Sequence, residues 1–334
     1  MKDTLYNQIN PLVRIEEGSL LKQEDFQKLL NASTFAEGTE ALRNTVYGQF
    51  IEEADFSEKF EYYLRQEQAR LYRKLYQLAP EKAVIDIYTM RYTYHNLKLL
   101  TKAHYTKQNL DEYVIEDGQY SLESLKSAIA NQSSTSVKGL LMASILEVTS
   151  YLAEYDKPRA IDIIYDRFYM ENQRQAAESL KYPELLQEVI AFIDLTNIST
   201  VIRGINQKQG ENFLNTVISD FGSLNSQELA SFADRSLAEF TDYLLSSPYK
   251  EVATDLMDSQ TGEISSIFIE RERDNFLTKL FIPAKVQAFG PLPLLALLNA
   301  KDIEVKNIQL ILVGLKNNFP AEAIAERMRK NYGL

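Results

Sequence analysis

The sequence contains no cysteine and only two histidines among its 334 residues. Without cysteine the chain has no disulfide, no thiol nucleophile and no cysteine metal site, which fits a reducing compartment. His95 and His104 lie nine residues apart, on different faces of a helix, and neither has an acidic residue three positions before it. The helical Glu-x-x-His metal pair is therefore absent. The acidic runs at 52–55 and 111–112 have no second cluster to pair with, so we interpret them as solvated faces and expect no metal site.

The motifs of several enzyme classes are also missing. The sequence has no Gly-x-x-x-x-Gly-Lys-Ser/Thr phosphate loop, no Gly-x-Gly-x-x-Gly fingerprint and no Gly-x-Ser-x-Gly elbow. Nothing in it is positive evidence for an enzyme. We assign no catalytic residue and no cofactor-binding residue.

Glycine and proline are scarce, with 12 and 9 residues, and no alternating Val/Ile runs bounded by turn pairs occur. This composition predicts an all-α fold. No run reaches the roughly 18–20 apolar residues that a bilayer span needs, because the best candidate, 292–298, is followed by Asn299, Lys301 and Asp302. No apolar leader follows Met1 either. We expect neither a membrane span nor a signal peptide.

The net charge of −11 argues against nucleic acid as a partner, because such binding depends on neutralising phosphates. One stretch, 65–107, is rich in basic residues with interleaved tyrosines. We interpret it as a solvated helix face with long cationic side chains, and a binding patch is the alternative. The interleaved residues are Tyr72, Tyr76, Tyr92 and Tyr94.

A short helical signature, in contrast, occurs three times. In each copy a proline opens a long apolar helix, an asparagine follows 14 to 16 residues later, and aliphatic residues stand one and four positions after the asparagine. The copies run from Pro80 to Asn96, from Pro183 to Asn197 and from Pro293 to Asn307. The asparagines lie 101 and 110 residues apart, close to one third of the chain length. This spacing predicts one subdomain present in triplicate.

A second marker agrees with the first in frame and spacing. Gly18, Gly118 and Gly222 are each followed by a polar candidate for a helix N-cap and then by a helical run. Together the two markers predict an N-terminal lead followed by three helical copies. The predicted boundaries are 1–17 for the lead and 18–117, 118–221 and 222–334 for the copies.

The third copy carries the most regular pattern. Its apolar residues predict one stripe along a helix from about 293 to 313, with Lys301 off the pattern. Pro293 suits the first turn and Gly314 suits the residue just past the end. A final helix is expected after Pro320, with Glu322 near its positive end.

The three signature asparagines, Asn96, Asn197 and Asn307, fall beside a buried stripe, where an amide must find hydrogen-bond partners. One interpretation is that each asparagine ties its helix to a neighbouring backbone. The alternative is a polar site repeated three times. We favour the first, because no titratable residue recurs beside all three asparagines.

The chain also resembles a known family. The block from Pro291 to Gly314, with Glu326-Arg327-Met328 after it, resembles the C-terminal part of the C subunit of bacterial and archaeal V/A-type rotary ATPases, the relative of the d subunit of eukaryotic vacuolar ATPases. The opening segments resemble that family too. They are Val13-Arg14, Leu20-Leu21, Phe26, Leu29-Leu30, Ala32, Leu42, Thr45 and Tyr47-Gly48.

This resemblance implies three helical subdomains around a pseudo-threefold axis, in a funnel-like arrangement. It implies a non-catalytic central-stalk subunit, a rotor socket whose wide end holds the foot of the central shaft and whose other face lies on the membrane rotor ring. The socket would pass torque for ATP-driven H⁺ or Na⁺ transport or for ATP synthesis. We expect it to be peripheral, at the cytoplasmic face of the membrane, without a cofactor, and we assign no partner-binding residue.

Two other interpretations belong to different classes. An α-helical scaffold or adaptor that binds partner helices or peptides would show a much shorter repeat than one near 100–110 residues. A helical hydrolase would need a catalytic constellation that the sequence does not contain.

Overall fold

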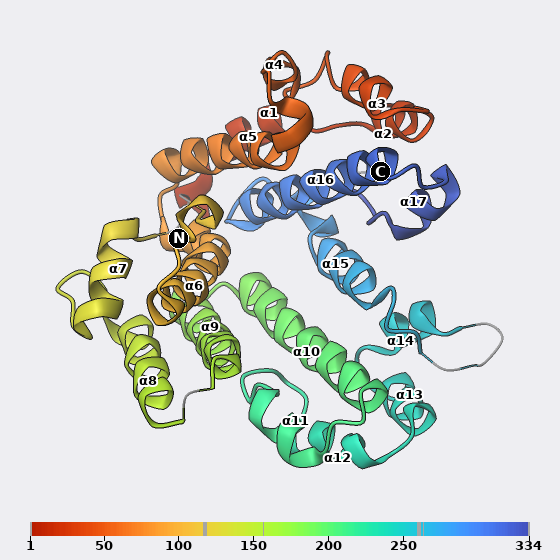
Figure 1. Cartoon of the computed structure of the whole chain (residues 1–334). Helices are drawn as coiled ribbons and strands as arrows, with labels where there is room; N and C mark the ends of the chain where they lie inside the picture. The colour runs from red at the N-terminus through yellow and green to blue at the C-terminus, as the bar shows by residue number, and fades with distance from the viewer. Residues whose placement is uncertain (1, 116–118, 156, 259–261, 263, 333–334) are drawn as a thin grey trace. The chain divides into compact units, whose positions relative to one another are not determined.

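The computed structural model describes residues 2–115, 119–155, 157–258, 262 and 264–332. These residues form seventeen α-helices and four short 3₁₀ helices (Figure 1). No strand is found in the described part of the chain, so the predicted all-α fold is confirmed. The chain divides into two compact units, residues 1–82 with 245–334 and residues 83–244. The division into three copies follows a different criterion and stays a prediction.

The first unit combines the two ends of the chain around one long helix, α16 (Leu292–Lys316). Every residue from 291 to 305 is buried, so this helix is enclosed on all sides. The elements that pack against it are α1 (Asn10–Glu17), α2 (Gln23–Leu30), α3 (Phe35–Ala41), α5 (Phe56–Leu78), α15 (Ile269–Leu280), η4 (Ile282–Val286) and α17 (Ala321–Arg327). The unit is completed by η1 (Lys2–Tyr6), α4 (Gly48–Ile51) and α14 (Lys250–Leu256).

The second unit is continuous in sequence. Its central element is α9 (Arg159–Leu180), which packs against α6 (Ala83–Thr106), α8 (Gly139–Tyr155) and α10 (Pro183–Asn206). The shorter elements are η2 (Asp111–Tyr113), α7 (Leu122–Asn131), α11 (Glu211–Val217), α12 (Ser226–Ser231) and η3 (Phe232–Asp234), and α13 (Leu237–Leu245) ends at the boundary of the unit.

The three signature helices are α6, α10 and α16, and each contains its asparagine in mid-helix. Pro183 and Pro293 occupy the first turn, as predicted, whereas Pro80 precedes its helix by three positions. All three helices end in the same way. A left-handed residue stands eleven positions after the asparagine, and the next N–H bonds back to the carbonyl five positions earlier, as in a Schellman cap. The left-handed residues are Lys107, Lys208 and Asn318, and the bonds run from Gln108 to Ala103, from Gln209 to Gly204 and from Phe319 to Gly314.

The prediction that Gly314 stands just past the end of its helix is wrong. Gly314 lies inside α16, and Asn318 takes the left-handed position instead. The reason for glycine is packing, because a Cβ atom there would lie 2.4 Å from Cδ1 of Ile324. The missing side chain lets α17 approach α16 closely. The predicted final helix is present, with Glu322 in its first turn.

The N-cap candidates after the glycine markers are confirmed in two places. Ser121 caps α7 by accepting from the N–H of Ser124, and Asn225 caps α12 by accepting from the N–H of Glu228. At α2 the N-cap is Lys22, and the carboxylate of Asp25 accepts from the Lys22 N–H. Gly118 lies outside the described residues.

Candidate functional site

The signature asparagines share one hydrogen-bonding pattern. Asn96 donates through Nδ2 to the carbonyl of Ile115 at 2.7 Å and accepts through Oδ1 from the N–H of the same residue at 2.9 Å. Asn197 makes the same pair of bonds with Ser219, at 2.8 and 2.9 Å. One side-chain amide thus satisfies both polar groups of a single backbone residue.

Asn307 repeats this pattern with Arg329, where both bonds measure 2.9 Å, and it also donates to Oδ1 of Asn331 at 2.8 Å. In the three copies the partner lies 19, 22 and 22 residues further along, in the segment that follows the long helix. All three asparagines are at most 2% exposed. Each asparagine therefore ties its helix to a neighbouring backbone.

We expect Asn307→Leu to lower the free energy of unfolding by about 1–3 kcal/mol, because the partly buried backbone groups of Arg329 lose their hydrogen-bond partner. Denaturant unfolding of the purified chain measures the loss. Asn317→Leu, at the exposed end of the same helix, is the matched control and should change stability by less. If Asn307→Leu melted like the wild type but uncoupled the assembled complex, the tie would have a role other than folding.

One helical turn before each asparagine, the same helix accepts a backbone N–H from the beginning of the next predicted copy. The pairs, acceptor first, are Thr93 with Gln119 at 3.2 Å, Asp194 with Ser223 at 2.8 Å and Glu304 with Leu21 at 2.5 Å. The last signature helix holds the beginning of the chain in this way. The three signature helices therefore share this contact as well.

The Asp194 pair also explains the glycine marker of the third copy. A Cβ atom on Gly222 would lie 2.0 Å from Oδ1 of Asp194. The carboxylate accepts from the N–H and hydroxyl of Ser223, at 2.8 and 2.5 Å, and from the N–H of Leu224 at 3.1 Å. Only glycine leaves room for a carboxylate this close to the backbone.

Helix α16 carries charged residues into the interior of the first unit. Lys301 is 1% exposed, and its Nζ lies 2.6 Å from Oε1 of Glu304 and 3.9 Å from Oε1 of Glu67. The hydroxyl of Tyr47 donates to the same Glu304 oxygen at 2.7 Å. Burial, and then the negative charge of Glu304, raise the pKa of Tyr47 well above its usual value, so this hydroxyl keeps its proton.

This buried ion cluster was not predicted from the sequence. The sequence feature that pointed to it was Lys301, a charged residue at a position where the apolar spacing of the helix calls for an apolar one. The adjacent Asp302 has hydrogen-bond partners on α5. Its Oδ1 accepts from the hydroxyl of Tyr72 at 2.6 Å and from the side-chain amide of Gln68. These contacts connect α16 to α5 through hydrogen-bonded charges, an arrangement that fixes one relative position of the two helices.

A second buried charge, Asp274 of α15, holds the C-terminal segment. Its Oδ2 lies 2.8 Å from Nζ of Lys306 and 3.0 Å from Nε of Arg329. Burial alone would raise the pKa of this carboxyl. The nearby charges of Lys306, Arg273 and Arg329 outweigh burial and lower the pKa from 3.8 to about 2.

This shift predicts an acid-sensitive component of stability. The pKa of Asp274 is lower in the folded than in the unfolded chain, so its contribution is present above the unfolded pKa and is lost as the pH falls from about 4 to about 2. We expect that loss to be on the order of 2 kcal/mol. Unfolding free energies measured over this pH range should fall less steeply in Asp274→Asn, whereas Asp162→Asn, in an exposed ion pair, should keep the wild-type slope. Equal slopes in all three proteins would contradict the assignment.

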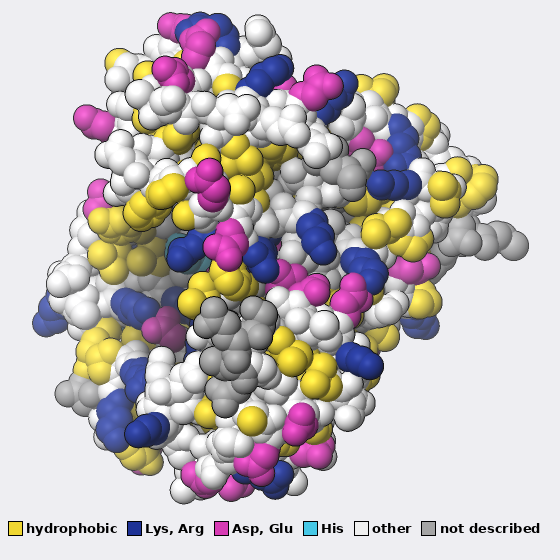
Figure 2. All heavy atoms as spheres, turned by 90° about the vertical axis from the view of Figure 1, so that its right-hand side faces the viewer, with side chains coloured by type: hydrophobic (Ala, Val, Ile, Leu, Met, Phe, Trp, Pro, Cys, Tyr) yellow, Lys and Arg dark blue, Asp and Glu magenta, His cyan; other side chains and the backbone are white. Residues whose placement is uncertain are grey.

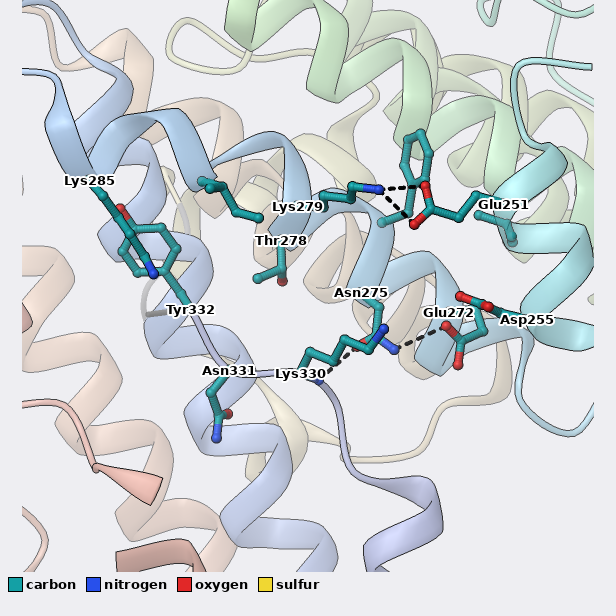
Figure 3. Close-up of a pocket in the computed structure, with 13 residues that line it drawn as sticks. Glu251, Asp255, Glu272, Asn275, Thr278, Lys279, Lys285, Lys330, Asn331 and Tyr332 are labelled. Atoms are coloured by element: carbon teal, nitrogen blue, oxygen red, sulfur yellow. Dashed lines mark hydrogen bonds and ion pairs between the residues drawn. The ribbon is translucent and has the colours of Figure 1, made fainter. Parts of the chain in front are cut away.

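A cavity of about 340 Å³ lies beside the same C-terminal segment (Figure 3). Lys279 and Glu251 form an ion pair at 2.6 Å on one side of it. On the other side Asn275 accepts from the N–H of Lys330 at 2.7 Å and donates to Glu272 at 3.1 Å. No serine or histidine is among the described residues that line the cavity. Within the lining, Lys279 and Glu251 therefore neutralise each other.

The two histidines belong to α6, in the second unit. His95 is exposed and its Nε2 lies 3.4 Å from the carbonyl oxygen of Tyr113, and His104 is exposed as well. Within the described ranges no group of three or more His, Cys, Asp or Glu side chains is placed to hold a metal ion. Basic and acidic side chains lie interspersed on the face shown in Figure 2.

We expected no segment long and apolar enough to cross a membrane, and helix α10 is an exception. Its 24 residues pass that test by length and hydropathy. However, 67% of its most apolar window is buried within the protein. It packs against α9, α11, α12 and η3 of its own unit, so its apolar surface is that of a core helix.

Comparisons with known proteins agree with one another. A family model described as the ATP synthase (C/AC39) subunit matches residues 9–327. The C subunit of the V-type sodium ATPase of Enterococcus hirae is 44% identical over 329 residues, which are 98% of this chain and 99% of that protein. The C subunit of the A-type ATP synthase of Methanocaldococcus jannaschii is 25% identical over 342 residues, covering 96% of this chain and 85% of the relative. The C subunit of the V-type ATP synthase of Thermus thermophilus is 26% identical over 206 residues, 58% of this chain and 62% of the relative.

Proposed function

The chain belongs to the ATP synthase (C/AC39) subunit family, as its resemblance to the C subunits of rotary ATPases indicated, and we propose that it is the rotor socket of a V/A-type rotary ATPase. In this role it is a non-catalytic central-stalk subunit that links the central shaft to the membrane rotor ring. It transmits torque for ATP-driven H⁺ or Na⁺ transport or for ATP synthesis. It lies at the cytoplasmic face of the membrane, as a peripheral part of the complex.

The observation that carries this proposal is the match over nearly the whole chain. The similarity to the Enterococcus hirae protein extends over 98% of this chain and 99% of the relative, so no large segment of either protein is left for a separate activity. A whole-length match of this kind favours the same place in an equivalent complex.

The internal construction of the two units supports a mechanical role. A part that passes rotation between two others must resist sliding of its own helices, and close-packed interiors transmit strain rather than absorb it. The asparagine ties fix α6, α10 and α16 to the segments that follow them. The cluster around Lys301 additionally fixes α16 within its unit.

The described residues offer little support for a catalytic role. In the cavity beside the C-terminal segment Lys279 pairs with Glu251, and inside α16 Lys301 pairs with Glu304. We therefore propose that ATP hydrolysis and ion movement take place in other subunits, and that this chain contributes rigidity and adhesion.

Isolation of the native complex through a tag on this chain tests the proposal. At an ionic strength near 0.1 M we expect shaft and ring subunits to co-purify. Near 1 M salt the Debye length falls from about 10 to about 3 Å, so attraction between the acidic chain and its partners should weaken and fewer partner subunits should remain. Isolation without any shaft or ring subunit at low salt would refute the proposal. Retention that does not change with salt would show that the contacts are not electrostatic.

A further inference from the structure

The connections that lead into the signature helices differ strongly in length. The chain needs four residues, 79–82, to enter α6, and two, 181–182, to enter α10. It uses eleven, 281–291, to enter α16. The extra residues form a feature of the third predicted copy that the other two copies lack at this position. We call residues 282–289 the entry loop.

The entry loop exposes apolar side chains to solvent. Val286 is 92% exposed and Phe289 is 54% exposed. The adjacent helix α1 exposes Pro11 and, one turn later, Ile15, which is 68% exposed. A shallow groove runs between the two, lined by Pro11 and Arg14 on one side and by Val286 and Phe289 on the other. Contiguous exposed apolar surface of this kind marks interaction sites in soluble proteins.

The loop is held in place by side chains of α1. Asn10 donates through Nδ2 to the carbonyls of Ala288 and Gly290, at 2.9 and 3.1 Å. Arg14 donates through Nη2 to the carbonyl of Gln287 at 3.0 Å and also to that of Ala284. These bonds satisfy four backbone carbonyls of the connection. A loop fixed in this way loses little conformational entropy when a partner binds.

The local charge of this surface is opposite to that of the whole chain. Lys285 is exposed beside Val286 and makes no ion pair with any described residue, although its Nζ lies 5.8 Å from the ring centre of Tyr332 (Figure 3). The chain as a whole carries a net charge of −11. A cation within an apolar surface, on an otherwise acidic protein, favours a partner segment that is apolar and carries a carboxylate.

We propose that the entry loop and the exposed face of α1 dock an apolar segment with a carboxylate from a subunit that is present once in the complex, on the shaft side. This inference rests on the proposed function. A ring of identical subunits offers the same contact repeatedly, so a socket built from three copies would meet it with equivalent surfaces. A docking surface built from the entry loop of the third copy and from α1 of the N-terminal lead is not repeated by the three copies, so it suits a partner that occurs once.

The test compares three full-length proteins with the wild type: Val286→Ser/Phe289→Ser, Lys285→Glu, and Ile267→Ser as an exposed apolar control outside the entry loop. Binding is measured separately to the ATP-hydrolysing head with its shaft and to the rotor ring in vesicles. Melting temperatures and sedimentation confirm that each variant is folded and report self-association. We expect the double variant to bind the shaft about tenfold or more weakly, Lys285→Glu to weaken shaft binding as well, and the control to stay within about twofold of wild type.

The outcomes separate this inference from the proposed function. If the wild type binds the shaft and the folded double variant binds it equally well, the proposed docking surface is refuted. The rotor-socket proposal is not affected by that result. If the double variant loses binding to the ring but not to the shaft, or loses self-association instead, the assigned partner is wrong. If the wild type binds neither shaft nor ring, the proposed function fails, and this inference fails with it.

Discussion

Vesicles that contain the complex without this subunit are expected to hydrolyse ATP and to move no ions. The physical reason is that a socket between shaft and ring matters only for passing rotation. The chain contains no phosphate-loop motif, and the described helix that is long and apolar enough to cross a membrane has 67% of its most apolar window buried within the protein, so neither half-reaction should depend on the chemistry of this chain. Pumping should therefore fall to background while hydrolysis by the soluble head continues.

The measurement needs both activities in the same preparation. ATP hydrolysis is followed in solution, and ion movement is followed by an indicator inside the vesicles, before and after the purified subunit is added back. Restored pumping on addition of the wild-type chain is the positive control. Undiminished ion pumping without the subunit would refute the rotor-socket proposal.

Replacing the buried lysine of α16 should be the most damaging single substitution among those considered. Lys301→Met leaves the Glu304 carboxylate inside the protein without its cation, whereas Glu67 keeps its ion pair with Arg70 at 2.7 Å. Loss of one partner from a buried ion pair costs about 3–5 kcal/mol, because the remaining charge is uncompensated. We expect the free energy of unfolding to fall by that amount.

Two further variants make this experiment specific. Lys316→Met changes the same residue type on the exposed end of the same helix and should cost less than about 1 kcal/mol. Lys301→Met/Glu304→Gln removes the stranded charge of Glu304 and should recover part of the loss. A cost below about 1 kcal/mol for Lys301→Met alone would show that water or a compensating shift reaches the cluster.

Local chain properties made much of the fold predictable. The apolar spacing around Asn307 predicted a helix at about 293–313, and the observed helix spans Leu292–Lys316. Ser121 and Asn225 were predictable as caps, because the preference depends on a side chain and its own neighbouring backbone. The end of α16 could not be predicted from local properties. Gly314 lies inside the helix and makes room for the side chain of Ile324, which belongs to α17.

The contacts of the candidate site could not be predicted where the hydrogen-bond or ion-pair partner lies far away in the chain. The asparagines could be found from their spacing, but their partners, such as Ile115, depend on how the chain returns along the helix. Lys301 interrupts a clear apolar pattern, yet Tyr47 and Glu67 lie about 250 residues away in the chain. The exposed apolar surface of the entry loop could not be predicted from the sequence, because its apolar residues are of much the same types as those of the core.

The discontinuity of the first unit has a consequence for biosynthesis. Residues 83–244 form a continuous unit and can fold while the rest of the chain is still on the ribosome. Residues 1–82 cannot, because the helix that fills their interior, α16, is made only after residues 83–244. Leu21, Phe26 and Tyr47 belong to a cluster completed by Ile308 and Leu312, so they stay uncovered until α16 has been translated. A prematurely terminated chain would present this apolar surface to chaperones and proteases, which would keep incomplete copies out of the assembly.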